Sequence, residues 1–171
     1  MGRCNYLVEG VSGSGKTAVC HELRRRGFSA VDGDRELAYQ GDPGTGEPVT
    51  GITGLAVHDH HIWDVRRVRA IAADRSDPAT FFCGGSRNAR SFLDVFDTVF
   101  VLTVDLHTLE QRLDARGEDE WAGAGRVDER ALVRRLHAAG TDTPDGVRLD
   151  ATLPLATVVD DLLRACGLPQ R

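Results

Sequence analysis

Long apolar runs are missing from this sequence, as are the cysteine spacings that mark disulfide frameworks and zinc sites. No stretch is apolar enough to cross a bilayer, so we expect no membrane partner. The first ten residues, MGRCNYLVEG, lead straight into a motif, and we therefore expect no signal peptide. The four cysteines are widely spread, and a reducing compartment would keep them as thiols. These absences predict a cytoplasmic protein.

Excess positive charge is missing as well. The chain has 21 lysines and arginines against 26 aspartates and glutamates, which gives a formal net charge of −5. Domains that bind nucleic acid are usually basic, so we expect no nucleic-acid partner. The one dense run of cations, at residues 24–26, lies at the end of a predicted helix, where positive charge complements the helix dipole.

Lysine is almost absent, because all but one of the basic residues are arginine and the exception is Lys16. An ammonium is a compact, flexible point charge, unlike the planar guanidinium. Lys16 lies in GVSGSGKT, residues 10–17, which matches the Walker A pattern GxxxxGK[ST]. A predicted buried strand at 4–9 precedes the motif, and a predicted helix that ends at Gly27 follows it. This is the context that a phosphate-binding loop requires.

In such a loop the backbone N–H groups turn inward around a nucleotide phosphate, and the helix N-terminus adds its positive end. Lys16 would reach the β- and γ-phosphates, and the Thr17 hydroxyl would bind Mg²⁺. A glycine-rich turn that binds nothing is the alternative, and the flanking elements argue against it. The residues predicted to bind nucleotide here are Gly10, Ser12, Gly13, Ser14, Gly15, Lys16 and Thr17.

Strands and helices alternate along all 171 residues, which predicts one α/β domain with a five-stranded parallel sheet and helices on both faces. Glycine- and proline-rich residues predict an irregular substrate-binding insertion at about 40–61 and a lid at about 117–127. The strands are predicted at 4–9, 28–33, 79–83, 98–104 and 146–150. The helices are predicted at 17–27, at 35–40 as a short one, and at 61–76, 106–117, 127–140 and 154–167.

Two features of other nucleotide-binding classes are missing. A GTP switch carries an NKxD segment, but the only asparagines are Asn5 and Asn88, and neither lies in such a setting. A motor-type ATPase has an apolar strand that ends in an acid, whereas the strand ATFFCGG at 79–85 ends in glycines. These absences leave a phosphotransferase as the favoured class.

Acidic residues appear instead after the second predicted strand, as VDGDRE at 31–36. In a doubly wound sheet the strand ends beside the phosphate loop line the ligand crevice. One of Asp32 and Asp34 can hold Mg²⁺ through water, while the other accepts a proton from a substrate hydroxyl. A surface turn is the alternative for Asp-Gly-Asp. The position directly after the second strand favours the functional interpretation.

The sequence resembles the shikimate kinase and small-molecule kinase branch of the nucleoside monophosphate kinase-like P-loop proteins. The resemblance rests on GVSGSGKT, on DGD after the second strand, on the CGGS strand end and on LEQRLDAR before the lid, and it covers most of the chain. It implies a three-layer P-loop fold with ATP and Mg²⁺ as cofactors. The implied reaction moves the γ-phosphoryl group of ATP to a hydroxyl of a small molecule. We expect the protein to be a monomer or a homodimer.

The resemblance also assigns roles to single residues. Asp34 is implied as the general base that binds the acceptor hydroxyl, and Asp32 as a ligand of magnesium-bound water. Gly84 and Gly85 would let the backbone approach the acceptor closely, as glycines at a strand end also do on physical grounds.

Two arginines near the predicted lid complete the implied site. By the same resemblance Arg112 would stack on adenine, and Arg116 would meet the transferring phosphate. Solvated helix charges are the alternative for both. Phosphoryl transfer needs a mobile cation, which favours a functional role for Arg116.

The acceptor is left open between a nucleoside, a polyol and a shikimate-like compound. Arg66, Arg67, Arg69 and Arg87 are all eligible to bind it, and Arg66 and Arg87 are our candidates. The HDHH run at 58–61 suggests either a metal site or a substrate-loop or surface role, and adjacent side chains rarely converge on one ion. Two other functions stay open: a nucleotide-binding regulator or slow ATPase without an acceptor, and a nucleic-acid-end kinase.

Overall fold

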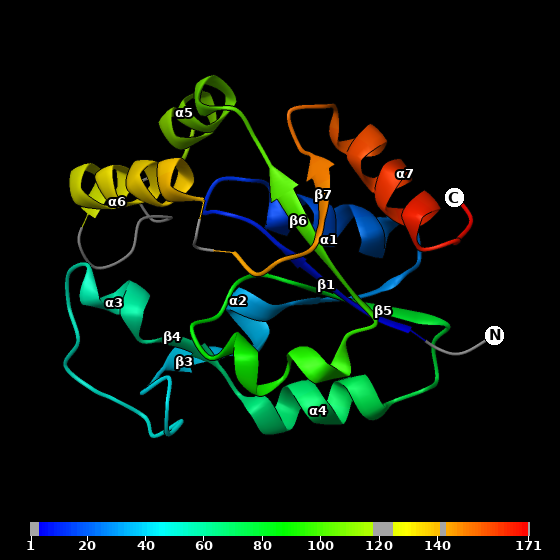
Figure 1. The fold of residues 1–171 in the computed structure, drawn as a ribbon, viewed down its shortest axis with the longest axis horizontal. Coiled ribbons are helices and arrows are strands. Elements are labelled where there is room, and N and C mark those ends of the chain that lie inside the picture. The colour runs from blue at the N-terminus through cyan, green and yellow to red at the C-terminus, as the bar shows by residue number, and fades with distance from the viewer. Residues whose placement is uncertain (1–3, 118–124, 141–142, 171) are drawn as a thin grey trace.

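The computed structural model describes residues 4–117, 125–140 and 143–170, which form a three-layer α/β fold (Figure 1). The central sheet is parallel and has the strand order β2-β5-β1-β6-β7. The predicted five-stranded sheet is therefore confirmed. Its strands are β1 (Cys4–Glu9), β2 (Ser29–Asp32), β5 (Ala79–Cys83), β6 (Thr98–Thr103) and β7 (Val147–Asp150).

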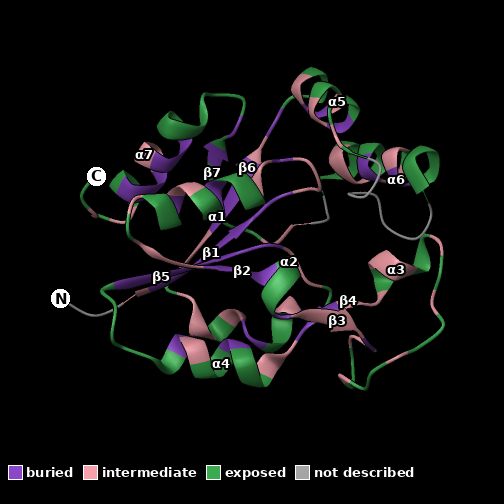
Figure 2. Ribbon diagram, turned by 180° about the vertical axis from the view of Figure 1, so that it is seen from behind, coloured by how far each residue is buried: buried purple, intermediate pink, exposed green. Residues whose placement is uncertain are grey.

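Helices cover both faces of this sheet. On one face, α1 (Lys16–Arg25), α5 (Leu106–Asp114) and α7 (Leu155–Ala165) bury leucines and valines against Tyr6 and Val8 of β1. On the other face, α4 (Val65–Ala73) and two 3₁₀ turns, Ala89–Ser91 and Leu93–Val95, pack against Leu7. The strands β1 and β5 are the most buried elements (Figure 2). Both faces of a parallel sheet must be covered, which explains the nearly continuous apolar strands.

The sequence prediction is wrong between residues 35 and 64. In place of one short helix at 35–40, α2 (Gly33–Glu36) ends early and β3 (Ala38–Gln40) follows. Residues predicted to begin the next helix form β4 (His61–Trp63), which pairs antiparallel with β3. The helix α4 starts later because the Asp64 side chain caps it, accepting from the backbone N–H groups of Arg66 and Arg67 at 2.9 and 3.1 Å.

The predicted insertion is irregular between Gly41 and Leu55, and it then forms the four-residue helix α3 (Ala56–Asp59). The helix α6 (Gly125–Ala139) lies near α3, at the end of the molecule where both are labelled in Figure 1. Most of the predicted lid, residues 118–124, lies outside the described residues. Across the described ranges, no helix has the length and apolar character that spanning a bilayer requires.

Candidate active site

The carboxyl ends of three neighbouring strands bring the predicted motifs together. The order β2-β5-β1 places the phosphate loop after β1, Gly84 and Gly85 after β5, and Asp32 and Asp34 after β2 at one edge of the sheet. Ligand crevices form at this edge in open parallel sheets. Residues far apart in sequence therefore share one site.

The phosphate loop has the backbone that its glycines allow. Gly13 and Gly15 have φ angles of +88° and +107°, a region that side chains with a Cβ rarely adopt. Gly10 is required for space as well, because a Cβ there would lie 2.5 Å from Ser14 Oγ. The loop leads directly into α1, so its N–H groups and the helix N-terminus point toward the same anion site.

Three cations surround this loop. Lys16 Nζ donates to the carbonyl oxygens of Gly10 at 2.6 Å and Val11 at 3.3 Å. The Arg112 guanidinium donates to Ser14 O at 2.8 Å, and Arg116 donates to Ser12 Oγ at 3.2 Å. The ammonium of Lys16 and the guanidinium of Arg116 are thus both held at the mouth of the loop, where phosphate oxygens would be attracted to them.

Asp34 faces the same space from α2. Its Oδ1 accepts from the backbone N–H of Gly85 at 3.1 Å and lies 3.1 Å from His61 Nε2. Burial alone would raise the pKa of Asp34, but the hydrogen bond with His61 and the charge of Lys16 outweigh it and hold the pKa below its usual value. The carboxyl group is therefore ionised at neutral pH.

Gly84 makes room for this carboxylate. A Cβ at Gly84 would lie 2.7 Å from Asp34 Oδ1 and 2.5 Å from Trp63 Cζ2, and the φ angle there is +148°. Gly84 at the end of β5 therefore admits the Asp34 side chain and the Trp63 ring. The resemblance had implied that these glycines give the backbone close approach to an acceptor.

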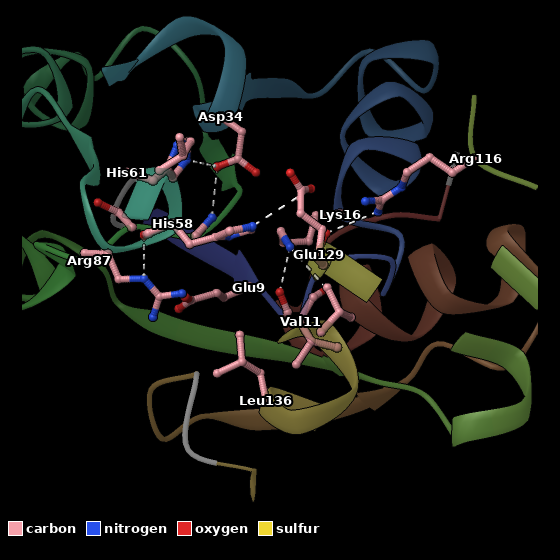
Figure 3. A pocket seen from close by; sticks show the side chains of 16 residues that line it. Glu9, Val11, Lys16, Asp34, His58, His61, Arg87, Arg116, Glu129 and Leu136 are labelled. Atoms are coloured by element: carbon pink, nitrogen blue, oxygen red, sulfur yellow. Dashed lines mark hydrogen bonds and ion pairs between the residues drawn. The ribbon is translucent and has the colours of Figure 1, made fainter. Parts of the chain in front are cut away.

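A cavity of about 240 Å³ opens between these groups (Figure 3). It joins seven of the residues predicted from sequence: Gly10, Ser12, Lys16, Asp34, Gly85, Arg87 and Arg116. Figure 3 shows Lys16, Asp34 and Arg116 converging from three different elements. The loop cations and the candidate base thus share a single space.

Other predicted residues lie outside this cavity lining. Arg66 and Arg67 are exposed on α4, and Arg69 binds Asp94 at 2.8 Å, so of the four eligible arginines only Arg87 lines the described cavity. Thr17 is exposed on the first turn of α1. Arg112 is held between the loop and Ala151 O, to which it donates at 2.6 Å. Gly13 packs beside Leu109.

The sequence analysis missed several lining residues. Glu9, the last residue of β1, is only 5% exposed, and Glu129 on α6 is 3% exposed. His58, from the HDHH run, places Nε2 4.0 Å from Glu129 Oε2, and His61 contacts Asp34. No metal-binding group of three or more side chains is found among the described residues. A charged residue on the apolar face of the predicted helix at 127–140 was the available signal for Glu129.

Comparisons with known proteins identify the family and the fold. A model of the AAA_18 family, an AAA domain, matches residues 7–132, which include the phosphate loop, both aspartates and Arg116. The chain belongs to the AAA_18 family. A search of curated protein sequences finds no significant match.

The AAA_18 chain has the fold of P-loop kinases. It resembles a sugar kinase from a Janibacter species with a TM-score of 0.61 and 16% identity, covering 99% of this chain and 97% of that one. A shikimate kinase from Bacteroides thetaiotaomicron gives a TM-score of 0.61 at 16% identity, with coverages of 96% and 99%. A gluconokinase from Sinorhizobium meliloti gives 0.55 at 18%, with coverages of 96% and 92%. The predicted resemblance is confirmed at the level of the fold.

The AAA_18 chain also has side chains that fit a hard divalent cation. Asp32 is 3% exposed, and within the described part of the chain its Oδ2 accepts no hydrogen bond. Arg35 Nε lies 3.8 Å from this oxygen. A carboxylate oxygen and a hydroxyl are ligands that Mg²⁺ prefers, and Asp32 and Thr17 carry them.

Proposed function

We propose that this protein is an ATP-dependent phosphotransferase that moves the γ-phosphoryl group of ATP to a hydroxyl of a small molecule. The observation that carries the proposal is the position of Asp34. Its ionised carboxylate faces the cavity that also holds Lys16 and Arg116, and it is fixed there by Gly85 and His61. A base and a phosphate loop in one cavity are what transfer to an alcohol requires.

In this reaction the acceptor oxygen forms a bond to the γ-phosphorus, and the bond from that phosphorus to the β,γ-bridging oxygen breaks. The hydroxyl proton passes to Asp34, and ADP is the leaving group. Lys16 and Arg116 stabilise the negative charge on the transferring oxygens. Thr17 and Asp32 would hold Mg²⁺, which would supply further charge neutralisation on the phosphates.

The comparisons support the reaction class by analogy. The three solved structures reported above are named as sugar kinase, shikimate kinase and gluconokinase, and this chain shares their fold over nearly its whole length. One fold can host many functions, so the site must carry the proposal. The formal net charge of −5 disfavours the nucleic-acid-end kinase.

The test is acceptor-dependent release of ADP, measured with a panel of nucleosides, sugars and cyclic polyols. Replacing Asp34→Asn should lower the acceptor-dependent rate about 100-fold or more, the usual contribution of a general base, while ATP binding stays intact. Asp59→Asn, at an exposed position on α3, is the matched control and should keep the full rate.

A different outcome would favour a nucleotide-binding regulator or a slow ATPase. In that case no acceptor would accelerate ADP release, and Asp34→Asn would leave the basal ATP turnover nearly unchanged. Binding of a fluorescent ATP analogue is measured on the same samples. It shows whether a lower rate in Asp34→Asn comes from weaker ATP binding.

A further inference from the structure

Two donors reach the same oxygen of the Asp34 carboxylate. The backbone N–H of Gly85 and Nε2 of His61 each lie 3.1 Å from Oδ1. The backbone at the end of β5 also passes close to this oxygen, since a Cβ on Gly84 would lie 2.7 Å from it. A carboxylate oxygen has about two lone-pair sites for hydrogen bonds. The accepting capacity of Oδ1 is therefore already used within the protein.

The other carboxylate oxygen, Oδ2, is in a different position. Figure 3 shows it turned away from His61 and toward the middle of the cavity. Within the described part of the chain, the hydrogen bonds of Asp34 are those to Oδ1, and Oδ2 accepts none. The Asp34 side chain is 36% exposed, so Oδ2 is open to a ligand in the cavity.

The backbone of His61 is itself held on two sides. On β4 it pairs with Gln40 of β3, and its carbonyl oxygen accepts from the N–H of Arg87 at 3.0 Å. Arg87 follows Gly85 by two residues. One short segment after β5 thus supplies one donor to Oδ1 and holds the strand that carries the other. This arrangement fixes the orientation of the carboxyl group.

The chemistry of the pair decides which group carries the hydrogen. An ionised carboxylate only accepts hydrogen bonds, so Nε2 of His61 carries a hydrogen and donates it to Asp34. A nitrogen that already carries this hydrogen cannot take a further proton. The geometry at Nε2 therefore favours Asp34 as the base and gives His61 a supporting role.

Other charged groups also face the cavity around Asp34. They come from β1, the phosphate loop, α3, α6 and the segments after β5 and α5: Glu9, Lys16, His58, Glu129, Arg87 and Arg116. Burial raises the pKa of Asp34, whereas the hydrogen bond from His61 is the strongest influence that lowers this pKa, followed by the charge of Lys16. Removal of the imidazole should therefore raise the pKa of Asp34 while the other charges stay in place.

We infer that Oδ2 of Asp34 is the atom that takes the acceptor proton, and that His61 is the positioning residue that turns this oxygen toward the acceptor. The acceptor hydroxyl donates to Oδ2, and its proton passes there as the acceptor oxygen bonds to the γ-phosphorus and ADP leaves. Without His61 the carboxyl group can rotate about its Cβ–Cγ bond, whose torsion is intrinsically broad. This inference rests on the proposed function and deepens it.

The first experiment measures the contact in the protein without substrates. The NMR signal of the Asp34 carboxyl carbon, identified by its loss in Asp34→Asn, is followed as the pH is lowered in the wild type and in His61→Leu. The signal in His61→Leu should begin to shift at a higher pH, because the hydrogen bond that favours the ionised form is gone. An Asp34 titration that is unchanged in His61→Leu overturns the inference.

His60→Leu is the matched control for this titration. His60 is the adjacent residue, and its Nδ1 lies 3.1 Å from the carbonyl oxygen of Gly41, outside the described cavity lining. In His60→Leu the Asp34 signal should titrate as in the wild type. A shift equal to that of His61→Leu would mean that a disturbed hairpin, and not the lost donor, changes Asp34, and it would overturn the inference.

The second experiment measures acceptor-dependent ADP release with an accepted compound. His61→Leu should lower kcat about tenfold or more and leave the KM for ATP unchanged, because small displacements of a reacting group are costly. His61→Gln places an amide N–H where Nε2 lies, so it should recover most of the kcat that the leucine variant loses. Thermal unfolding is recorded for each variant, and rates are compared per folded molecule.

The outcomes separate the two proposals. If His61→Gln is as inactive as Asp34→Asn, the imidazole itself takes the proton, and the role assigned to His61 is overturned while the proposed function stands. A kcat that is unchanged in His61→Leu overturns that role as well. A panel in which no compound accelerates ADP release overturns the proposed function, and the NMR titration then still shows whether His61 acts on Asp34.

Discussion

At the scale of single residues, the site depends on backbone positions that tolerate no side chain. Gly84 is the clearest case because both the Asp34 carboxylate and a buried tryptophan occupy the space beside it. Asp34 Oδ1 and Trp63 Cζ2 would lie 2.7 and 2.5 Å from a Cβ, closer than normal van der Waals contact. Trp63 cannot move easily, since it is fully buried and stacked on Phe92 with ring centroids 5.6 Å apart.

Gly84→Ala is therefore expected to destabilise the fold by about 1–3 kcal/mol and to displace Asp34. The acceptor-dependent rate per folded molecule should fall at least tenfold, because small displacements of a reacting group are costly. Urea unfolding and the ADP-release assay measure the two effects.

Gly27→Ala provides the control. Its φ angle is also positive, at +82°, but nothing lies within 4 Å of a Cβ there. Gly27→Ala should lower the free energy of unfolding but leave the acceptor-dependent rate per folded molecule unchanged. Equal losses of rate in both variants would mean that Gly84 acts only through stability.

The residues of the phosphate loop could be predicted from sequence because their pattern is local: eight consecutive residues specify the turn, the lysine and the helix start. Asp34 could be placed because strand ends share one edge. Glu9, His58 and Glu129 could not be placed as readily. They come from three distant elements, and His58 of α3 lies 4.0 Å from Glu129 of α6 only in the folded chain.

At the scale of elements, the first residue of α4 sets where the insertion ends. One helix was predicted from the apolar spacing of Ile62, Val65, Val68 and Ile71. However, Ile62 belongs to β4, where it pairs with Tyr39 and is buried. A short strand and a helix turn have similar apolar patterns over three residues, so periodicity alone does not separate them. The deciding feature is Asp64, whose side chain satisfies two N–H groups at the start of α4.

Asp64→Ala should therefore destabilise the protein by about 1 kcal/mol, the usual cost of losing an N-cap. The change is measured as a lower urea midpoint with an unaltered m-value. Asp64→Ser, which retains a capping oxygen, should recover most of the stability. If serine and alanine are equally destabilising, the cap is not the reason that α4 begins at Val65.

At the scale of the whole molecule, ion pairs connect helices that are distant in sequence. Glu110 of α5 binds Arg134 and Arg130 of α6, and these partners lower its pKa to about 2. Glu22 of α1 binds Arg25 and Arg26, which lower its pKa to about 2 as well. Arg26 also pairs with Asp160 of α7.

These pairs predict how stability changes in acid. The folded-state pKa values lie below the unfolded value of about 4.5, so the stabilisation is fully present above pH 4.5 and is lost as the pH falls toward 2. The thermal midpoint should drop across this window. Glu110→Gln should have a lower midpoint at pH 7 and a shallower drop. A variant whose pH profile runs parallel to that of the wild type would contradict the assignment.

The architecture was predictable at the level of fold class, because alternating strands and helices with a P-loop specify a covered parallel sheet. The strand order β2-β5-β1-β6-β7 was not read from the sequence. Nor could the pattern show that α3 and α6 meet across the cavity. The pair of His58 and Glu129 joins the insertion to the chain after the predicted lid, and these two residues are about seventy positions apart.

The central claim is that Asp34 prepares an acceptor hydroxyl opposite a bound triphosphate. The most direct measurement follows the γ-phosphoryl group of radiolabelled ATP with an accepted polyol present, in the wild type and in Asp34→Asn. We predict that the label enters a phosphomonoester in the wild type and that the variant, still binding ATP, loses this product. Label that appears only as inorganic phosphate, at equal rates in both proteins, would contradict the account.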